Sequence, residues 1–235
     1  MLGSVERDFA TETLRRSSLF RLVDDASLSK LADSLRLRRY RRNQVIFNEG
    51  DPGDSLFVIR AGVVKIVLGS RVDEEEAIIA TLARGDFFGE LALFDGRPHS
   101  ASAVALEPTE ALVLDRTAFF ELIDTQPAFR RALFGALAVE LRRLTRHVEE
   151  LHFLDLPGRL ASRLVRLAAD AAPGQRTDIR LDWPYTQSEL AAMIGGTRQS
   201  VNRLLADMTS RNLLRVERDT IVIPDLDRLS REAER

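Results

Sequence analysis

The pattern of hydrophobic residues changes near residue 116, and this change constrains the fold more than any other feature. Between residues 35 and 115, apolar residues gather in short runs such as SLFVIR, VVKIVLG and EALVLD. The runs recur about every 8–12 residues and are separated by turn residues, which is typical of an antiparallel barrel or double-sheet roll. Residues 9–36 instead have the pattern of short helices, and a further helix is expected to begin near Arg116.

A long helix is expected after Gln126 and Pro127, ending near Leu154. Apolar residues recur in it at alternating spacings of three and four: Phe134, Leu137, Leu141, Leu144, Val148 and Leu151. This spacing is typical of a coiled-coil seam. Charged residues cover the rest of the helix, so the narrow seam favours self-association, most simply as a two-fold homodimer. The alternative is a helix that packs only on its own domain.

Pro157 and Gly158 end this helix and mark a domain boundary. Beyond them we expect a helix to about Ala169, a strand in IRLDW, two helices joined by Gly195-Gly196, and a hairpin in RVERDTIVI. This order is typical of a winged helix-turn-helix. The sequence therefore predicts an α+β protein with a β-roll sensor domain at 1–125, a dimerisation helix at 126–156 and a winged helix-turn-helix DNA-binding domain at 157–235.

The last of these helices is predicted to have one apolar and one polar face. At 100° per residue, Val201, Leu204, Leu205 and Met208 fall on one side. The opposite side carries side chains that can read base edges, since Arg pairs with guanine and Gln or Asn with adenine. Thr197 is expected to cap the helix, and the preceding helix to begin near the DNA backbone. The expected DNA-binding residues are Thr186, Gln187, Thr197, Arg198, Gln199, Ser200, Asn202 and Arg203. A merely solvated polar face is the alternative.

Composition excludes several function classes. The 235 residues include no cysteine, so an iron–sulfur cluster, a disulfide and a thiol nucleophile are excluded. The longest apolar run, at 132–139, is far shorter than the roughly 20 residues of a membrane helix. No secretory signal is visible, so a cytoplasmic protein is expected. We find no catalytic motif and no cluster of metal ligands, so neither an enzyme nor a metal site is expected.

Taken together, these segments resemble the cyclic AMP receptor protein/FNR (CRP/FNR) family of bacterial transcription regulators. The resemblance covers nearly the whole chain and is carried by FNEGDPGDSLFVIRAGVVKI, FFGELALFDGRPHSASA, FLDLPGRLA and GGTRQSVNRLL. It implies a cyclic-nucleotide-binding roll, a homodimer, binding to a two-fold symmetric site on double-stranded DNA, and RNA polymerase as a partner.

The resemblance also implies a ligand-binding cassette. In the family, a Gly-Glu pair holds the ribose, and an Arg followed by a small residue holds the cyclic phosphate. Here His99 and Ser100 replace the Arg and its neighbour, and a neutral imidazole cannot form the fork of a guanidinium. Cyclic AMP affinity is therefore expected to fall sharply unless Arg97 supplies the cation. The residues that match the rest of the cassette are Gly89, Glu90, Leu91 and Ala92.

Two more departures from the family bear on specificity. Leu144 and Thr145 stand where cyclic AMP-responsive members place two polar residues against the adenine. Members that recognise a TGTGA half-site carry Arg-Glu where this chain has Arg198-Gln199. Because Glu accepts from cytosine and Gln favours adenine, we expect a half-site that keeps the guanine and differs at the neighbouring pair.

Three alternatives remain open from the sequence. The roll senses a small ligand, or its pocket is degenerate and the protein binds DNA without a ligand. A haem sensor would have to use His99, His147 or His152 as axial ligands. A nucleotide-binding protein without DNA affinity is disfavoured by the polar face around Arg198.

Overall fold

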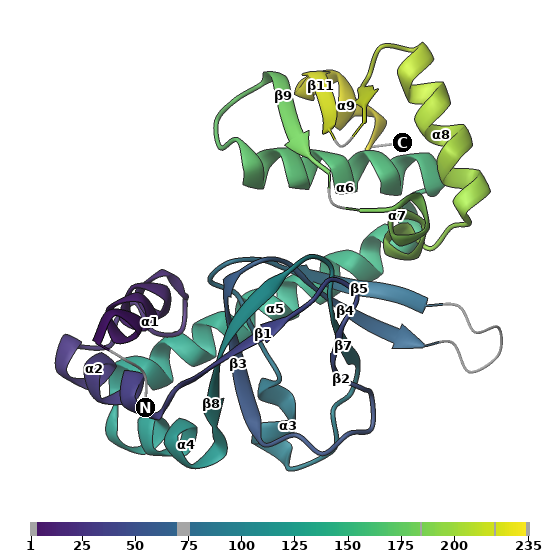
Figure 1. Ribbon diagram of the computed structural model, residues 1–235. Coiled ribbons are helices and arrows are strands. Elements are labelled where there is room, and N and C mark those ends of the chain that lie inside the picture. The colour runs from purple at the N-terminus through teal and green to yellow at the C-terminus, as the bar shows by residue number, and fades with distance from the viewer. Residues whose placement is uncertain (1–3, 70–75, 184, 219, 234–235) are drawn as a thin grey trace. The chain divides into compact units, whose positions relative to one another are not determined.

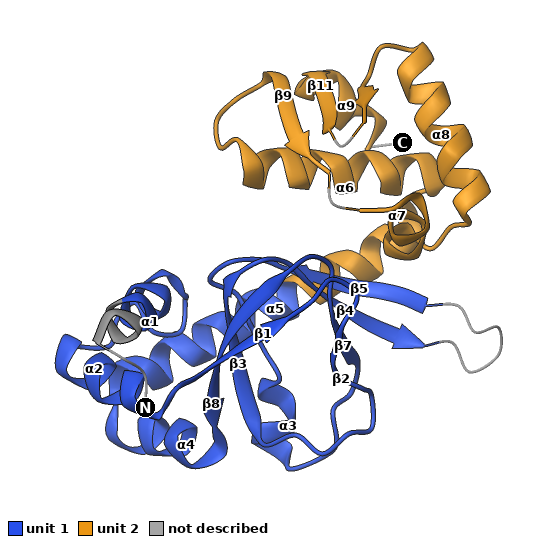
Figure 2. Cartoon of the chain, in the orientation of Figure 1, with its two compact units in different colours: residues 1–142 blue, residues 143–235 orange. Residues whose placement is uncertain are grey.

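The computed structural model describes residues 4–69, 76–183, 185–218 and 220–233 (Figure 1). The chain divides within one helix into two compact units, residues 1–142 and 143–235 (Figure 2). The domain boundaries expected after residues 125 and 156 stay predictions. None of the helices in the described ranges has the length and apolar character needed to cross a bilayer.

The first unit is built around two four-stranded antiparallel sheets. One has the strand order β1-β8-β3-β6 and the other β2-β7-β4-β5. The strands are β1 (Arg36–Tyr40), β2 (Val45–Phe47), β3 (Ser55–Ala61), β4 (Val64–Gly69), β5 (Glu76–Leu82), β6 (Phe87–Phe88), β7 (Ser102–Ala105) and β8 (Thr109–Asp115). The expected β-roll is confirmed, and the runs SLFVIR, VVKIVLG and EALVLD form the greater part of β3, β4 and β8.

Alternation along β3 explains how one sheet serves two cores. Leu56 and Val58 face a cluster shared with the helices, whereas Ile59 packs with Val64 and Phe88 of the roll. The helices of this unit are α1 (Ser4–Arg16), α2 (Asp25–Ser34), α3 (Glu90–Asp95), α4 (Arg116–Thr125) and the start of α5 (Pro127–Phe153). Asp115 caps α4 by accepting a hydrogen bond from the amide of Ala118 at 2.9 Å. The expected switch to helix at residue 116 therefore has a local cause.

The first turns of α5 are anchored in the helical core of this unit. Phe129 and Leu133 are buried there, and the Phe129 ring lies 5.2 Å from that of Phe20 and 5.8 Å from that of Phe119. Burial of an aromatic side chain of this size contributes about 2–3 kcal/mol. The helix is therefore held at its N-terminal end by ordinary core packing.

The second unit combines helices with a small sheet. A three-stranded sheet has the order β10-β11-β9. The elements of the second unit are the end of α5, α6 (Leu156–Ala171), β9 (Thr177–Asp182), α7 (Gln187–Ile194), α8 (Arg198–Ser210), β10 (Arg215–Glu217), β11 (Thr220–Asp225) and α9 (Leu226–Glu232). The expected strand, helix pair and terminal hairpin are all present, and the predicted fold class is confirmed.

The junction between α5 and α6 is tighter than the sequence suggests. The helix α5 ends at Phe153, before Pro157 and Gly158, and these two residues lie in the first turn of α6. Asp155 accepts a hydrogen bond from the amide of Gly158 at 2.8 Å and caps the helix. Proline is tolerated in a first helical turn because its missing amide has no partner there. The Pro-Gly pair therefore starts the second helix directly after the first ends.

Candidate nucleic-acid interface and ligand site

The helix α7 begins with a reciprocal cap. Thr186 accepts a hydrogen bond from the amide of Glu189 at 3.2 Å, and the Glu189 carboxylate accepts from the amide of Thr186 at 2.8 Å. Two of the amides left open at a helix start are thereby satisfied. Gln187 is exposed beside the cap. Thr186 and Gln187 thus stand at a fixed helix start, as expected.

The turn from α7 to α8 depends on glycine at its first position. Gly195 ends α7 in the left-handed conformation, with φ 67°, and the amide of Gly196 donates to the carbonyl of Ala191 at 3.0 Å. A residue with a Cβ pays about 1–2 kcal/mol in that conformation. Thr197 then caps α8 and accepts from the amide of Ser200 at 3.1 Å, as predicted. The Ser200 hydroxyl lies 2.9 Å from that of Thr197.

The two faces of α8 divide as the angular pattern predicts. Val201, Leu205 and Met208 are buried, and Leu204 is half-buried. They pack beside α7, whose Leu190 and Ile194 are also buried. The opposite face is exposed and carries Arg198, Gln199, Asn202 and Arg203. A continuous row of donors and acceptors on a capped helix is suited to the base edges of a major groove.

The hairpin after α8 supplies a second exposed strip. Arg215 pairs with Val222 across β10 and β11, and Arg218 lies at the turn with φ 33°. Arg180 on β9 forms an ion pair with Glu217 at 2.7 Å. This is the wing expected from RVERDTIVI.

In the first unit, the cassette is shaped by its backbone. Gly89 precedes α3 in the left-handed conformation, with φ 88°. A Cβ at this position would lie 2.8 Å from the carbonyl oxygen of Ser55 and 3.1 Å from the Phe57 ring. Only glycine fits here without displacing the strand. Glu90 and Leu91 follow in the first turn of α3, where Leu91 is exposed and Ala92 is buried.

His99 is part of the packed interior of the roll. It is 7% exposed, and its ring stacks on Phe47 with centroids 3.6 Å apart. A Cβ on Gly53 would lie 2.8 Å from the His99 Cε1 atom, so the ring also presses on the loop before β3. Backbone hydrogen bonds join the two segments, because the His99 amide donates to Asp51 at 2.9 Å and the Gly50 amide donates to His99 at 2.8 Å.

This environment favours the neutral form of the His99 imidazole. Burial lowers the pKa of His99 below its usual value, and nearby Asp51 and Asp54 offset this only in part. A neutral ring stacked on Phe47 cannot stand in for a guanidinium toward a phosphate. The packing of His99 is therefore a structural reason to expect low affinity for cyclic AMP.

Arg97 is directed elsewhere. Its side chain is 83% exposed, and its Nε lies 3.8 Å from the carboxylate of Asp95. The backbone amide of Arg97 donates to the same carboxylate at 2.9 Å. Ser100 is exposed as well. In this structure the exposed Arg97 side chain pairs with Asp95, and its contact with a ligand stays a prediction.

The remaining predicted ligand residues lie on α5. Leu144 and Thr145 are exposed there, in the second compact unit. Their contact with a ligand stays a prediction. His147 and His152 are on the same helix, and no group of three or more metal-ligating side chains is found in the described parts of the chain.

Sequence reasoning missed two residues of the cassette region, Phe47 and Gly53. Phe47 stacks on His99, and its ring also lies 5.7 Å from that of Phe57. Gly53 leaves the space that the imidazole occupies. Both belong to the segment FNEGDPGDSLF that carries the resemblance, but no periodicity marks either as a neighbour of His99.

Comparisons with known proteins agree with this architecture. Residues 37–126 match the cyclic nucleotide-binding domain, and residues 158–232 match the Crp-like helix-turn-helix domain. A CRP-like cAMP-activated global transcriptional regulator of Mycobacterium tuberculosis is 34% identical, over 94% of this chain and 99% of its own length. The cyclic AMP receptor protein of Thermus thermophilus is 30% identical, over 89% of this chain and 94% of its own length.

A solved structure also resembles the chain. A mutant of CooA from Carboxydothermus hydrogenoformans superposes with a TM-score of 0.73 and 28% identity, covering 86% of this chain and 88% of that one. The fold and these matches together define a DNA-binding transcription regulator with a cyclic nucleotide-binding domain. The chain belongs to the CRP/FNR family. The family comparisons point to regulators and not to enzymes.

Proposed function

We propose that this regulator acts as a homodimer that binds a two-fold symmetric DNA site. The observation that carries the proposal is the exposed apolar seam of α5. Phe134, Leu141 and Val148 are 68%, 66% and 57% exposed, although water disfavours three such side chains along one helix. Leu137, by contrast, packs against the core of the first unit. Pairing with a second copy would bury the rest of the seam.

Pairing would also set the spacing of the two reading helices. Half-sites in DNA lie about 34 Å apart, one turn of the duplex, so a dimeric regulator needs two copies of its reading helix at that separation. The exposed row from Arg198 to Arg203 on α8 supplies the base contacts, and the capped helix starts at Thr186 and Thr197 supply backbone contacts.

Sedimentation of seam variants tests dimerisation directly. Leu141→Glu places a charge in the proposed interface and should raise the dimer dissociation constant about 100-fold or more, because a buried unpaired charge costs several kcal/mol. DNA affinity, measured by electrophoretic mobility shift, should fall with it. Arg146→Glu, on the face of α5 away from the seam, is the matched control. A monomeric wild-type protein would contradict the proposal.

The roll is proposed to sense a small ligand. Two relatives bear names that refer to cyclic AMP, which favours a cyclic nucleotide. His99 argues against high affinity for cyclic AMP, because the phosphate loses its bidentate partner. A bound ligand would shift the population of dimers toward the orientation of α8 that fits DNA.

Ligand-independent DNA binding is the second candidate. The stack of His99 on Phe47, tightened by Gly53, favours it because the imidazole lies in the packed interior of the cassette region. Operator binding with and without a panel of cyclic nucleotides separates the two candidates. Tighter binding with one nucleotide supports the sensor, and an unchanged affinity with all of them supports the constitutive regulator.

RNA polymerase is the proposed protein partner, on the strength of membership in a family of transcription regulators. Reconstituted transcription from a promoter that carries the selected operator tests this partnership. A change in transcript yield that requires intact Arg198 would support it. No metal or cluster cofactor is proposed.

A further inference from the structure

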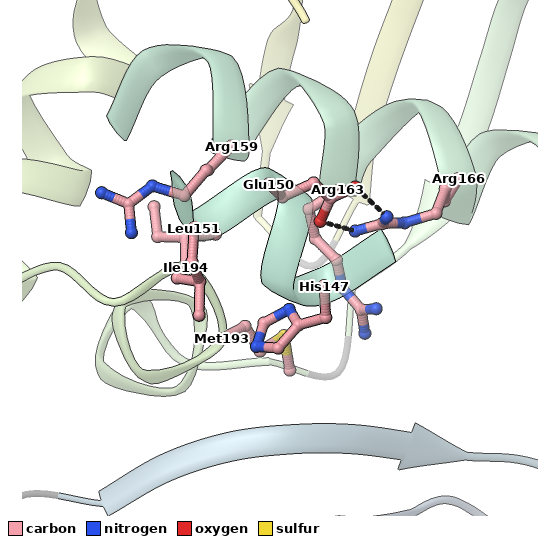
Figure 3. Close-up of a pocket in the computed structure, with 8 residues that line it drawn as sticks. All are labelled: His147, Glu150, Leu151, Arg159, Arg163, Arg166, Met193 and Ile194. Atoms are coloured by element: carbon pink, nitrogen blue, oxygen red, sulfur yellow. Dashed lines mark hydrogen bonds and ion pairs between the residues drawn. The ribbon is translucent and has the colours of Figure 1, made fainter. Parts of the chain in front are cut away.

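One carboxylate joins the end of α5 to α6 (Figure 3). Glu150 accepts two hydrogen bonds from the guanidinium of Arg166, one of them at 3.0 Å between Arg166 Nη2 and Glu150 Oε2. The Ser162 hydroxyl donates to Glu150 Oε1 at 2.8 Å. The Glu150 side chain is only 11% exposed, so water competes little for these hydrogen bonds. This Glu150 contact therefore holds the last turns of α5 against α6.

The charge of Glu150 suits its surroundings. Arg159, Arg163 and Arg166 are spaced four and three residues apart, so they share one face of α6. Among the side chains drawn in Figure 3, Glu150 is the only carboxylate. Hydrogen bonds between ionised groups are stronger than those between neutral ones. Removing the charge of Glu150 would take away the carboxylate with which Arg166 pairs, in a place where the nearby charges are positive.

The Glu150 contact lies well away from the joint between the two helices. The helix α5 ends at Phe153, and α6 begins at Leu156. Arg166 lies ten residues beyond Leu156, which at 1.5 Å per residue is about 15 Å along α6. A given change in the angle between the helices moves distant atoms further than atoms at the joint. The Glu150 contact therefore resists bending more strongly than the Asp155 cap at the joint does.

The same joint supports the start of the reading helix. A Cβ on Gly196 would lie 3.0 Å from the Cδ1 atom of Leu156, and a Cβ on Gly195 would lie 3.8 Å from the Cδ2 atom of Leu151. The turn between α7 and α8 therefore lies against the first residue of α6 and the end of α5. Leu151 also belongs to the exposed seam of α5. A change in the angle between α5 and α6 would thus shift α8 relative to the seam.

We propose that Glu150 is a positioning residue, which fixes the angle between α5 and α6 and thereby the spacing of the two reading helices in the dimer. This inference rests on the proposed homodimer. The seam residues Leu144, Val148 and Leu151 belong to the same compact unit as α6 and α8, so the joint connects the seam to the reading helix within one unit. Loss of the Glu150 contact should leave the dimer intact and widen the range of spacings that the two copies of α8 sample.

Operators with altered half-site spacing test this role. Moving one half-site by a base pair shifts it by about 3.4 Å and turns it by about 35° around the duplex, which a rigid pair of reading helices cannot follow. Glu150→Gln keeps the size of the side chain and removes its charge. We expect the preference of this variant for the best spacing over the shifted ones to fall about tenfold or more. Mobility shifts at constant salt concentration measure the preference.

Three further variants separate positioning from other effects. Glu149→Gln is the matched control, because Glu149 is the neighbour of Glu150 on α5 and is exposed, and it should keep the wild-type preference. Ser162→Ala removes a single hydrogen bond and should lower the preference about threefold, so it tests the role even if Glu150→Gln fails to fold. Adding Arg166→Gln to Glu150→Gln should cause little additional loss, because the two side chains act through one contact.

A distance measurement between the two reading helices gives a second readout. The chain has no cysteine, so Ser210→Cys at the exposed end of α8 introduces one site for a spin label in each copy. Pulsed electron resonance then reports the distribution of distances between the two labels of a dimer. We expect a broader distribution with Glu150→Gln than with Glu149→Gln or with the labelled parent.

An unchanged spacing preference in a folded, dimeric Glu150→Gln variant would overturn the inference. Equal losses in Glu150→Gln and Glu149→Gln would also overturn it, because they would reflect a general loss of negative charge. The inference is wrong as well if the wild-type dimer binds all spacings alike. A monomeric wild-type protein would overturn the proposed homodimer together with this inference, and sedimentation of the same samples distinguishes that failure from a failure of the Glu150 contact alone.

Discussion

The reading surface of α8 and the cassette around α3 are built in opposite ways. The reading surface consists of side chains on a regular, capped helix, with its apolar half buried against α7. The cassette depends on backbone conformation at Gly89 and on the close approach of Gly53 to His99. On a regular helix, recognition can be altered by replacing one side chain at a time. In a site formed by turns, a substitution that moves the backbone alters the whole site. By the resemblance, the reading helix departs from the family at Gln199 and the cassette departs from it at His99, and the effect of each departure stays a prediction.

Gly89→Ala should have the largest effect, because it breaks the cassette through its backbone. The new Cβ meets the Ser55 carbonyl at 2.8 Å in a left-handed residue, and we expect a loss of about 2–4 kcal/mol in the free energy of unfolding. Gly96→Ala is the matched control at the other end of α3. Gly96 is also left-handed, but no atom lies within 4 Å of its added Cβ, so about 1 kcal/mol is expected. Equal losses in urea unfolding would refute the crowding argument.

His99→Arg sharpens the comparison by restoring the missing cation. We expect cyclic AMP affinity to rise about tenfold or more, because charge-assisted hydrogen bonds to phosphate are stronger than those of a neutral ring. Calorimetric titration of both proteins measures this. Arg97→Gln should leave the affinity unchanged, since Arg97 points to Asp95. Micromolar cyclic AMP binding by the wild-type protein would contradict the role assigned to His99.

Gln199→Glu tests the opposite side of the comparison, where one side chain changes recognition without changing the fold. Glu accepts from cytosine, so the variant should gain preference for the TGTGA half-site by about 1–3 kcal/mol. Selection from random DNA, followed by mobility shift, measures the preference. Gln175→Glu, in the loop before β9, makes the same charge change away from α8. The assignment of Gln199 fails if wild type already prefers TGTGA.

The same contrast explains what could be predicted from the sequence. The buried and exposed faces of α8 follow from a period of 3.6 residues, and this period places Val201 on the buried side and Arg198 on the exposed side, as the structure has them. The strand β1 was not among the runs singled out, because RLRRY is mostly charged and its partner β8 supplies the pairing. The stack of Phe47 on His99 joins distant segments, and no local pattern encodes such a contact.

The smallest expected effect is a fall in stability on acidification, which should reveal that His99 is packed in its neutral form. Burial lowers its folded-state pKa below the unfolded value of about 6.5, so the unfolded chain binds the proton more readily. The stability due to His99 is therefore complete above the unfolded pKa and is lost as the pH falls from there toward the folded pKa.

We expect His99→Gln to flatten the decline in the urea midpoint between about pH 7.5 and about pH 5.5. His147 also has a lowered pKa, so some decline remains. His152→Gln, at an exposed position, is the control for the loss of a histidine outside the roll. If the urea midpoints of His99→Gln and His152→Gln fall alike with pH, burial does not hold the His99 ring neutral. The contrast between a packed cassette and an open reading surface then loses its main support.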